Sequence, residues 1–134
     1  MRLFLSTLLA LTLLGALPIR AEDGTSAGDP ARGAEIYERC DACHSLERNR
    51  TGPRHCGLFG RTAGSVPGFR YSNAMKRSGI VWSPATLDKF LENPRKDVPG
   101  TFMTYAGVTD ARDRRDLIAY LEKADADPAL CPRD

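Results

Sequence analysis

Apolar side chains recur at the spacing of an α-helix in several parts of the sequence, and no segment shows the alternation of a useful β-strand. A first helix is predicted over residues 29–40, where an aspartate and a proline can start it. A short helix is expected at 72–78, and a clearer one from residue 83 until Pro94 ends it. The last helix is expected to begin near residue 109 or 110, with an apolar face of Leu117, Ile118, Tyr120, Leu121 and Ala124. These patterns predict an all-α chain.

Residues 51–69 interrupt the helical pattern because glycine and proline are concentrated there. The residues of these two types are Gly52, Pro53, Gly57, Gly60, Gly64, Pro67 and Gly68. Such a segment is either a long functional loop or disordered. Gly33 lies inside the first predicted helix, where glycine costs about 1 kcal/mol relative to alanine, and it therefore suggests the close approach of another backbone. A small helical chain with long loops also needs something besides side chains to fill its interior.

The N-terminal residues have the features of a secretory signal peptide. Arg2 precedes an apolar run over residues 3–17, and a cleavage site is expected near Ala21. The run has about 15 residues, fewer than the roughly 20 of a membrane-spanning helix, and Pro18 would end it; an uncleaved anchor is the alternative. We predict a signal peptide over residues 1–21, a flexible leader over 22–28, a single domain over 29–126 and a tail over 127–134.

The balance of charge gives no support for a strongly charged partner. The whole chain has 19 basic and 17 acidic side chains. Cleavage after Ala21 would remove Arg2 and Arg20, so that 17 basic side chains would face 17 acidic ones. The mature protein would then be near neutral, which argues against a nucleic-acid partner bound through net charge.

Cys40-Asp41-Ala42-Cys43-His44 forms a C-x-x-C-H sequence, the attachment signature of c-type haem. Two thiols three residues apart at a helix end can each reach one vinyl group of haem, and the following histidine can bring its imidazole to the iron. The alternatives are a thioredoxin-type redox pair and half of a zinc site. The first expects a preceding strand and the second another pair of ligands, and the sequence offers neither context. The motif therefore predicts one covalently bound haem c.

The iron of such a haem has a sixth ligand or an open position. The candidates for this ligand are Met75, Met103 and His55. We favour Met103, because it lies in a loop between two predicted helices, where a side chain can be aimed inward without helical constraints. A methionine that is buried only for packing is the alternative.

The order of these residues resembles mitochondrial-type cytochrome c and the related bacterial cytochromes c2 over roughly residues 33–124. Besides the haem motif, the matching segments are Gly52-Pro53, Gly57-Leu58-Phe59-Gly60-Arg61, Phe69 with Tyr71, Gly79-Ile80-Val81-Trp82, Leu91-Glu92-Asn93-Pro94, the loop at 99–107 and Asp116-Leu117-Ile118-Ala119-Tyr120-Leu121. The resemblance implies the class I cytochrome c fold, in which four or five helices wrap around one covalently bound haem. It also implies that the first and last helices cross where Gly33 and Tyr37 meet Leu117 and Tyr120.

The same resemblance implies the roles of the site residues. It makes His44 the proximal iron ligand and Met103 the distal one. The carbonyl of Pro53 would accept a hydrogen bond from the second nitrogen of His44 and so fix the orientation of the imidazole. The residues that match those holding the haem propionates in relatives are Arg61, Tyr71, Trp82 and Thr101. Plain core packing is the alternative for the two aromatic members of this set.

Three features depart from the family pattern. The segment between the haem motif and Pro53 is shorter than in the mitochondrial proteins, and Met75 stands where the family usually has an asparagine near the haem. Cys56 occupies a position where relatives commonly have histidine, with His55 beside it. Cys56 and Cys131 are an even pair left over in an exported protein, so they either form a disulfide or remain two free thiols.

We therefore expect a soluble, periplasmic, monohaem carrier of single electrons without enzymatic activity. Iron with histidine and methionine ligands has no open site for a substrate, whereas a haem enzyme or gas sensor needs a vacant or displaceable position. A third class, a disulfide-stapled domain without haem, conflicts with the haem motif. The expected partners are redox proteins: a membrane oxidase, a photosynthetic reaction centre, a periplasmic dehydrogenase or a cytochrome bc1 complex. The protein is expected to be a monomer.

A thin ring of basic side chains is expected to steer the encounters with these partners. In relatives, lysines around the exposed haem edge attract acidic partners. The matching region of this sequence retains Arg39, Arg95 and Lys96, with Lys76 and Arg77 nearby. Phe102 and Glu35 stand at positions that are usually basic. The attraction should therefore be weak, and a solvated charged face without a partner is the alternative.

Overall fold

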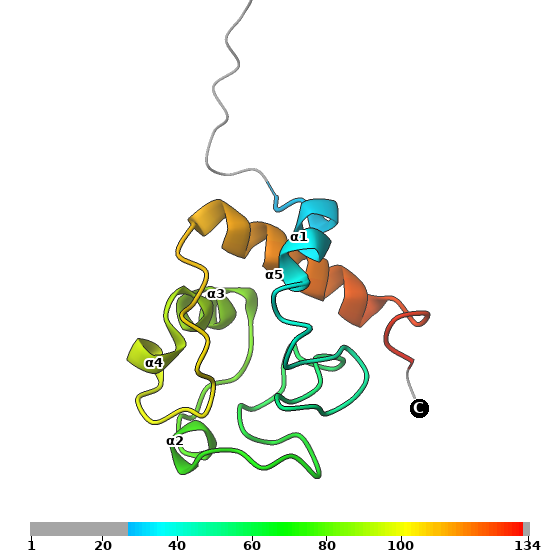
Figure 1. Cartoon of the computed structure of the whole chain (residues 1–134). Coiled ribbons are helices and arrows are strands. Elements are labelled where there is room, and N and C mark those ends of the chain that lie inside the picture. The colour runs from blue at the N-terminus through cyan, green and yellow to red at the C-terminus, as the bar shows by residue number, and fades with distance from the viewer. Residues whose placement is uncertain (1–26, 133–134) are drawn as a thin grey trace, which may run out of the picture.

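The computed structural model describes residues 27–132 and forms five helices within this range. They are α1 (Pro30–Tyr37), α2 (Asn73–Lys76), α3 (Pro84–Glu92), α4 (Pro94–Asp97) and α5 (Ala111–Ala126) (Figure 1). The described residues contain no β-strand, only an isolated antiparallel bridge between Thr62 and Val81. The prediction of an all-α chain is therefore confirmed. The predicted signal peptide, most of the predicted leader and the last two residues of the tail lie outside the described residues.

Helices begin where the sequence supplies a side chain that accepts hydrogen bonds from free backbone amides. A carboxylate oxygen of Asp29 accepts from two amides of the first turn of α1, at 2.9 and 3.4 Å. Ser83 and Thr86 form a reciprocal capping box at the start of α3. Asp110 caps α5 by accepting a hydrogen bond of 2.8 Å. These caps explain why the starts of the three longer helices were predictable.

Two helix ends differ from the prediction. The first predicted helix extended to Cys40, but α1 ends at Tyr37 and tight turns follow it. The amide of Cys40 donates to the carbonyl of Tyr37 at 2.7 Å, three residues back, which is a narrower turn than that of an α-helix. Pro94 ends α3 as predicted, but it also begins α4, because proline suits the first position of a new helix and Asn93 caps it.

Helices α1 and α5 cross in direct contact (Figure 1). Gly33 makes this contact close, since a side chain there would overlap the backbone carbonyl of Asp116 and the Cβ of Tyr120. The rings of Tyr37 and Tyr120 lie 5.1 Å apart, and the Arg32 guanidinium forms an ion pair of 2.5 Å with Asp116. The predicted crossing, and the close backbone approach expected at Gly33, are both confirmed.

The loop at residues 51–69 is ordered by hydrogen bonds to the chain that leads into α3. The amides of Gly60 and Ala63 donate to the carbonyls of Trp82 and Ile80, both at 2.8 Å. These bonds join segments about twenty residues apart in the sequence. Of the two alternatives for this segment, the structure supports an ordered loop.

The remaining chain forms the opposite wall of the molecule. Figure 1 shows the loops before α2 on one side below α5, and α3, α4 and the return segment 98–110 on the other. The amide of Val108 donates to the carbonyl of Leu91 at 2.8 Å, which fastens this return segment to α3. Within residues 27–132, no helix is both long enough and apolar enough to cross a bilayer.

Candidate functional site

A cavity of about 210 Å³ lies between these two walls. Protein interiors pack at the density of organic crystals and leave few voids larger than a water molecule. A cavity of this size in so small a chain is therefore a binding site and not a packing defect. All nine residues predicted for the site line it, namely Cys40, Cys43, His44, Pro53, Arg61, Tyr71, Trp82, Thr101 and Met103.

The haem motif follows α1 and is wound into a tight turn. The amides of Cys43 and His44 both donate to the carbonyl of Cys40, at 3.0 and 2.9 Å, so both thiols and the imidazole reach the cavity. Both thiols are free. Burial, helped by the Asp41 carboxylate, raises the pKa of the Cys40 thiol to about 11. Residues 27–132 contain no group of three or more histidine, cysteine or acidic side chains that could hold a metal, which leaves the zinc alternative without support.

His44 is oriented by the dipeptide that follows it in the loop. Its Nδ1 lies 2.8 Å from the carbonyl oxygen of Pro53, so Nδ1 carries the proton and Nε2 is the nitrogen left to bind a metal. A side chain at Gly52 would overlap the His44 ring, which explains why a glycine precedes the proline. Desolvation lowers the pKa of His44, although the bond to Pro53 opposes this shift. The imidazole is therefore held neutral, the form that ligates iron.

His55, one of the three candidates for the sixth ligand, lies against His44. The two rings are stacked with centroids 4.4 Å apart and planes 21° apart. The Nδ1 of His55 lies 2.9 Å from the Tyr37 hydroxyl. Desolvation lowers the pKa of His55 well below its usual value, with His44 and Arg61 contributing repulsion. If His44 held the iron, a residue stacked on its ring would lie on the same side of the metal, so this position does not suit His55 as the ligand opposite His44.

Met103 lies in a loop that backbone and side-chain hydrogen bonds hold in place. Its amide donates to the Thr101 hydroxyl at 3.2 Å, and the amide of Thr101 donates to the carbonyl of Val98 at 3.0 Å. The Arg95 guanidinium donates to the carbonyl of Thr104 at 3.0 Å. The Met103 side chain is partly buried and lines the cavity. The loop therefore presents a fixed thioether to the cavity.

Met75 and Phe102 have surroundings that differ from those of Met103. Met75 also lines the cavity, but it lies in the helix α2 and belongs to the buried hydrophobic core. Phe102 is 61% exposed, and it adds an apolar side chain to the surface next to Met103.

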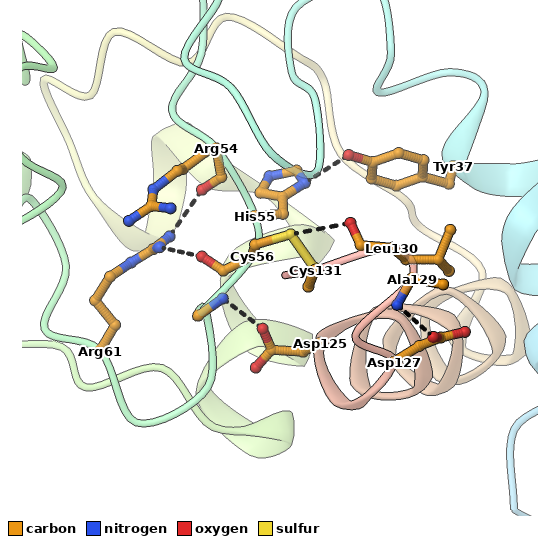
Figure 2. The surroundings of a disulfide bond; sticks show 11 residues. Tyr37, Arg54, His55, Cys56, Arg61, Asp125, Asp127, Ala129, Leu130 and Cys131 are labelled. Carbon is orange, nitrogen blue, oxygen red and sulfur yellow. Dashed lines mark hydrogen bonds between the residues drawn. A yellow bond between two sulfur atoms is a disulfide. The ribbon is translucent and has the colours of Figure 1, made fainter. Parts of the chain in front are cut away.

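Three of the four residues matched to propionate contacts lie outside the Met103 loop, and each has different surroundings. Arg61 donates to the carbonyls of Cys56 and Arg54 at 3.1 and 3.0 Å (Figure 2), and desolvation lowers its pKa. Trp82 is buried and packs edge to face on Phe90, with centroids 5.2 Å apart. The Tyr71 ring lies edge to face on Phe69, and burial raises its pKa. Core packing is therefore real for both aromatic residues, and it is compatible with a place at the cavity wall.

A disulfide joins the loop beside the cavity to the C-terminal tail (Figure 2). The sulfur atoms of Cys56 and Cys131 are 1.94 Å apart, and the two residues are 75 positions apart in the sequence. The amide of Gly57 donates to the carboxylate of Asp125 in α5, which adds a second link between the same two parts of the chain. The tail beyond α5 is thus part of the packed molecule.

The family model of cytochrome c matches residues 30–125. The chain belongs to the cytochrome c family. The cytochrome c of Euglena viridis is 51% identical over 98 residues, which cover 71% of this chain and 96% of the relative. The cytochrome c2 of Rhodomicrobium vannielii is 42% identical over 114 residues, which cover 83% and 91% of the two chains. The solved structure of cytochrome cH from Methylobacterium extorquens superposes with a TM-score of 0.70 at 41% identity and covers 72% of this chain and 99% of its own.

Family membership establishes that this cytochrome has the class I cytochrome c fold and haem c as its cofactor, attached through cysteines. The residues present fit that group. An apolar cavity opens beside the two free thiols, and the neutral imidazole of His44 has Nε2 available. Members of the family are carriers of electrons, and this cytochrome shares that general function.

Sequence reasoning missed the contact between His55 and His44. The resemblance treats residue 55 only as a neighbour of the unusual Cys56, and nothing in the spacing of the two histidines predicts a stack. The usable signal lies in the Gly52-Pro53 dipeptide. It turns the chain back over His44, so the residues that follow it must pass close to the imidazole.

Proposed function

We propose that this cytochrome carries single electrons in the periplasm, with its haem iron bound by His44 and Met103. The observation that supports the proposal most is that one cavity is lined by both thiols of the motif, by an imidazole with its Nδ1 held and by a thioether on a fixed loop. When bound, the haem supplies an iron that alternates between the ferric and ferrous states, and a thioether ligand favours the ferrous one.

The chain's own residues would keep the iron six-coordinate. Pro53 and Gly52 restrict the imidazole of His44, while Thr101 and Arg95 restrict the loop that carries Met103. A site with both ligands fixed changes little in geometry between oxidation states, and it leaves no open position for a substrate. We infer a carrier and not an enzyme from this arrangement.

The propionates would be held at the wall that contains Arg61, Tyr71, Trp82 and Thr101. Buried carboxylates require hydrogen-bond donors, and these side chains supply a guanidinium, a phenol, an indole and a hydroxyl. Arg61 uses two of its five N–H groups on backbone carbonyls, so it also ties the loop to the proposed propionate contact.

The compartment is inferred from the two ends of the chain. Residues 1–21 have the pattern of a cleaved signal peptide, which would leave the leader at 22–28, the haem domain at 29–126 and the tail at 127–134. A disulfide in that tail suits an oxidising compartment. We therefore propose a periplasmic monomer. Its partners would be redox proteins: a reaction centre, a terminal oxidase, a dehydrogenase or a cytochrome bc1 complex.

The proposed iron ligands are tested by comparing two methionine variants of the ferric protein. Methionine-ligated ferric haem shows a weak far-red charge-transfer band, so Met103→Ala should abolish this band and allow cyanide to bind the ferric protein and carbon monoxide to bind the reduced, ferrous protein. Met75→Ala is the matched control, because it removes the other methionine of the same cavity and should do neither. Loss of the band in the Met75 variant alone would reverse the assignment, and rapid binding of carbon monoxide by the wild-type ferrous protein would favour a haem enzyme or sensor.

A further inference from the structure

The stack of His55 on His44 is the feature of the site that the carrier function leaves unexplained. With centroids 4.4 Å apart and planes 21° apart, the rings are as close as stacked aromatic side chains come. Both rings also line the cavity.

The known partner of His44 fixes only part of its orientation. The bond from Nδ1 to the Pro53 carbonyl sets the direction of one ring atom, and the close contact with Gly52 limits the ring near Cε1. Gly52 lies against the ring near Cε1, where a Cβ would overlap that atom and both ring nitrogens. The His55 ring adds a plane nearly parallel to that of His44.

His55 is itself held from two directions. Its Nδ1 lies 2.9 Å from the Tyr37 hydroxyl, shown as a dashed line in Figure 2, and its amide donates to the carbonyls of Ser45 and Leu46. Tyr37 in turn packs on Tyr120 at the crossing of α1 and α5. A row of rings therefore runs from the crossing of the terminal helices to the imidazole of His44.

We propose that His55 is a positioning residue that sets the plane of the His44 imidazole, and that Tyr37 holds His55 in place for this purpose. The proposal rests on the proposed function, in which His44 binds the iron. The orientation of an imidazole bound to haem iron determines the energy difference between the iron d orbitals that interact with its ring and those that do not. An imidazole that can turn would therefore give several iron environments where a clamped one gives one.

Electron paramagnetic resonance of the frozen, low-spin ferric holoprotein measures this splitting directly through its g values. In His55→Leu, which removes the flat ring, we expect shifted g values and broadened lines. In His55→Phe, which restores a flat ring, we expect g values near those of the wild type. Tyr37→Phe keeps its own ring but loses the hydroxyl, and we expect broadened lines because the His55 ring is free to turn.

Ile118→Val is the matched control for general destabilisation, because Ile118 is buried in α5 but does not line the cavity. Its g values should equal those of the wild type. The positioning role is overturned if His55→Leu leaves the spectrum unchanged, or if Ile118→Val and His55→Phe shift it as much as His55→Leu does. If His55→Leu does not fold, unchanged lines in Tyr37→Phe overturn the proposal instead. The far-red band of the wild type is recorded alongside: its absence would contradict the Met103 assignment, whereas its presence with unchanged g values contradicts only the role of His55.

Discussion

The crossing of α1 and α5 and the walls of the cavity are held together in different ways. At the crossing, the chain supplies every contact: backbone meets backbone at Gly33, two tyrosine rings pack together and Arg32 pairs with Asp116. Around the cavity, loops and short helices are tied to one another by hydrogen bonds, but their apolar side chains face a space that the chain does not fill. We infer from this difference that the helix crossing is specified by the sequence alone, whereas the stability of the cavity side also depends on the cofactor.

Removing both cysteines that attach the haem should have the largest effect, because the cavity side would lose the cofactor that it packs against. In the Cys40→Ser, Cys43→Ser double variant the cavity walls lose the group that they pack against, so we expect loss of cooperative thermal unfolding by circular dichroism. Haem should also be absent from the chain on a denaturing gel. The Cys56→Ser, Cys131→Ser double variant is the control with the same number of changes, and it should keep its haem. If the haem-free variant unfolded as cooperatively as the wild type and at the same temperature, the cavity side would not need the haem for its stability.

The disulfide is expected to contribute the next largest effect, because it ties the cavity side to the end of α5. Cys131→Ser should lower the free energy of unfolding by about 2–4 kcal/mol, measured by denaturant titration. With the haem kept ferrous in every sample, a disulfide reductant should lower the stability of the wild type by a similar amount and leave that of the variant unchanged. Unfolded, unreduced wild-type protein should take up no thiol label, and uptake of two labels would mean that the cysteines are free.

Two glycine substitutions should distinguish the helix crossing from the cavity side, because one should change the free energy of unfolding and the other the haem spectrum. Gly33→Ala overlaps the Asp116 carbonyl, so it should lower the free energy of unfolding by about 1–3 kcal/mol while the haem spectrum stays the same. Gly52→Ala overlaps the His44 ring, so it should alter the ferric haem spectrum. Glu35→Ala, on the exposed face of α1, is the control and should change neither. A spectral change in Gly33→Ala would mean that the two regions are coupled more tightly than their contacts indicate.

Electrostatic steering should be the smallest effect, and it concerns only the surface of the cavity side. Arg39 lies 3.7 Å from Asp113 and is partly neutralised. The chain that the proposed cleavage would leave is near neutral, so it would add little long-range attraction. Electron transfer to an acidic redox protein should slow as salt rises, since the Debye length falls from about 30 Å at 0.01 M to about 10 Å at 0.1 M. The slope should be shallower than that of a mitochondrial cytochrome c. Lys96→Glu should flatten it further, whereas Lys123→Glu in the last turn of α5 should do so less; a rate that is flat or rises with salt would remove steering.

Local signals in the sequence are enough to predict where the three longer helices begin, because caps act within a few residues. Asp29, Ser83 and Asp110 start their helices where expected. The end of α1 was misplaced, because the haem motif winds into tighter turns that periodicity does not reveal. The helix α4 is not predicted because proline is a stop signal for the preceding helix and equally a start signal for a new one, and Pro94 acts as both.

The candidate site was predictable as a set of residues and not as an arrangement. The nine residues follow from the haem motif and the family resemblance, and all of them line the cavity. The order of the loop at 51–69 depends on bonds to residues 80–82, which no local pattern can indicate. The stack of His55 on His44 has the same origin, since it forms only after the loop has turned at Pro53.

The spacing of the four cysteines also constrains how the protein is made. In a chain that is exported with its N-terminus first, Cys131 is the last cysteine to emerge, 75 residues after its partner. Until then Cys56 can meet only Cys40 and Cys43, and a bond to either would consume a thiol needed for haem. If the chain is exported as proposed, its biogenesis would depend on which reaction comes first, because a reductase or the haem would have to protect Cys40 and Cys43 until Cys131 arrives. Strongly oxidising expression hosts should accumulate mispaired apoprotein, visible as a ladder of bands on a non-reducing gel.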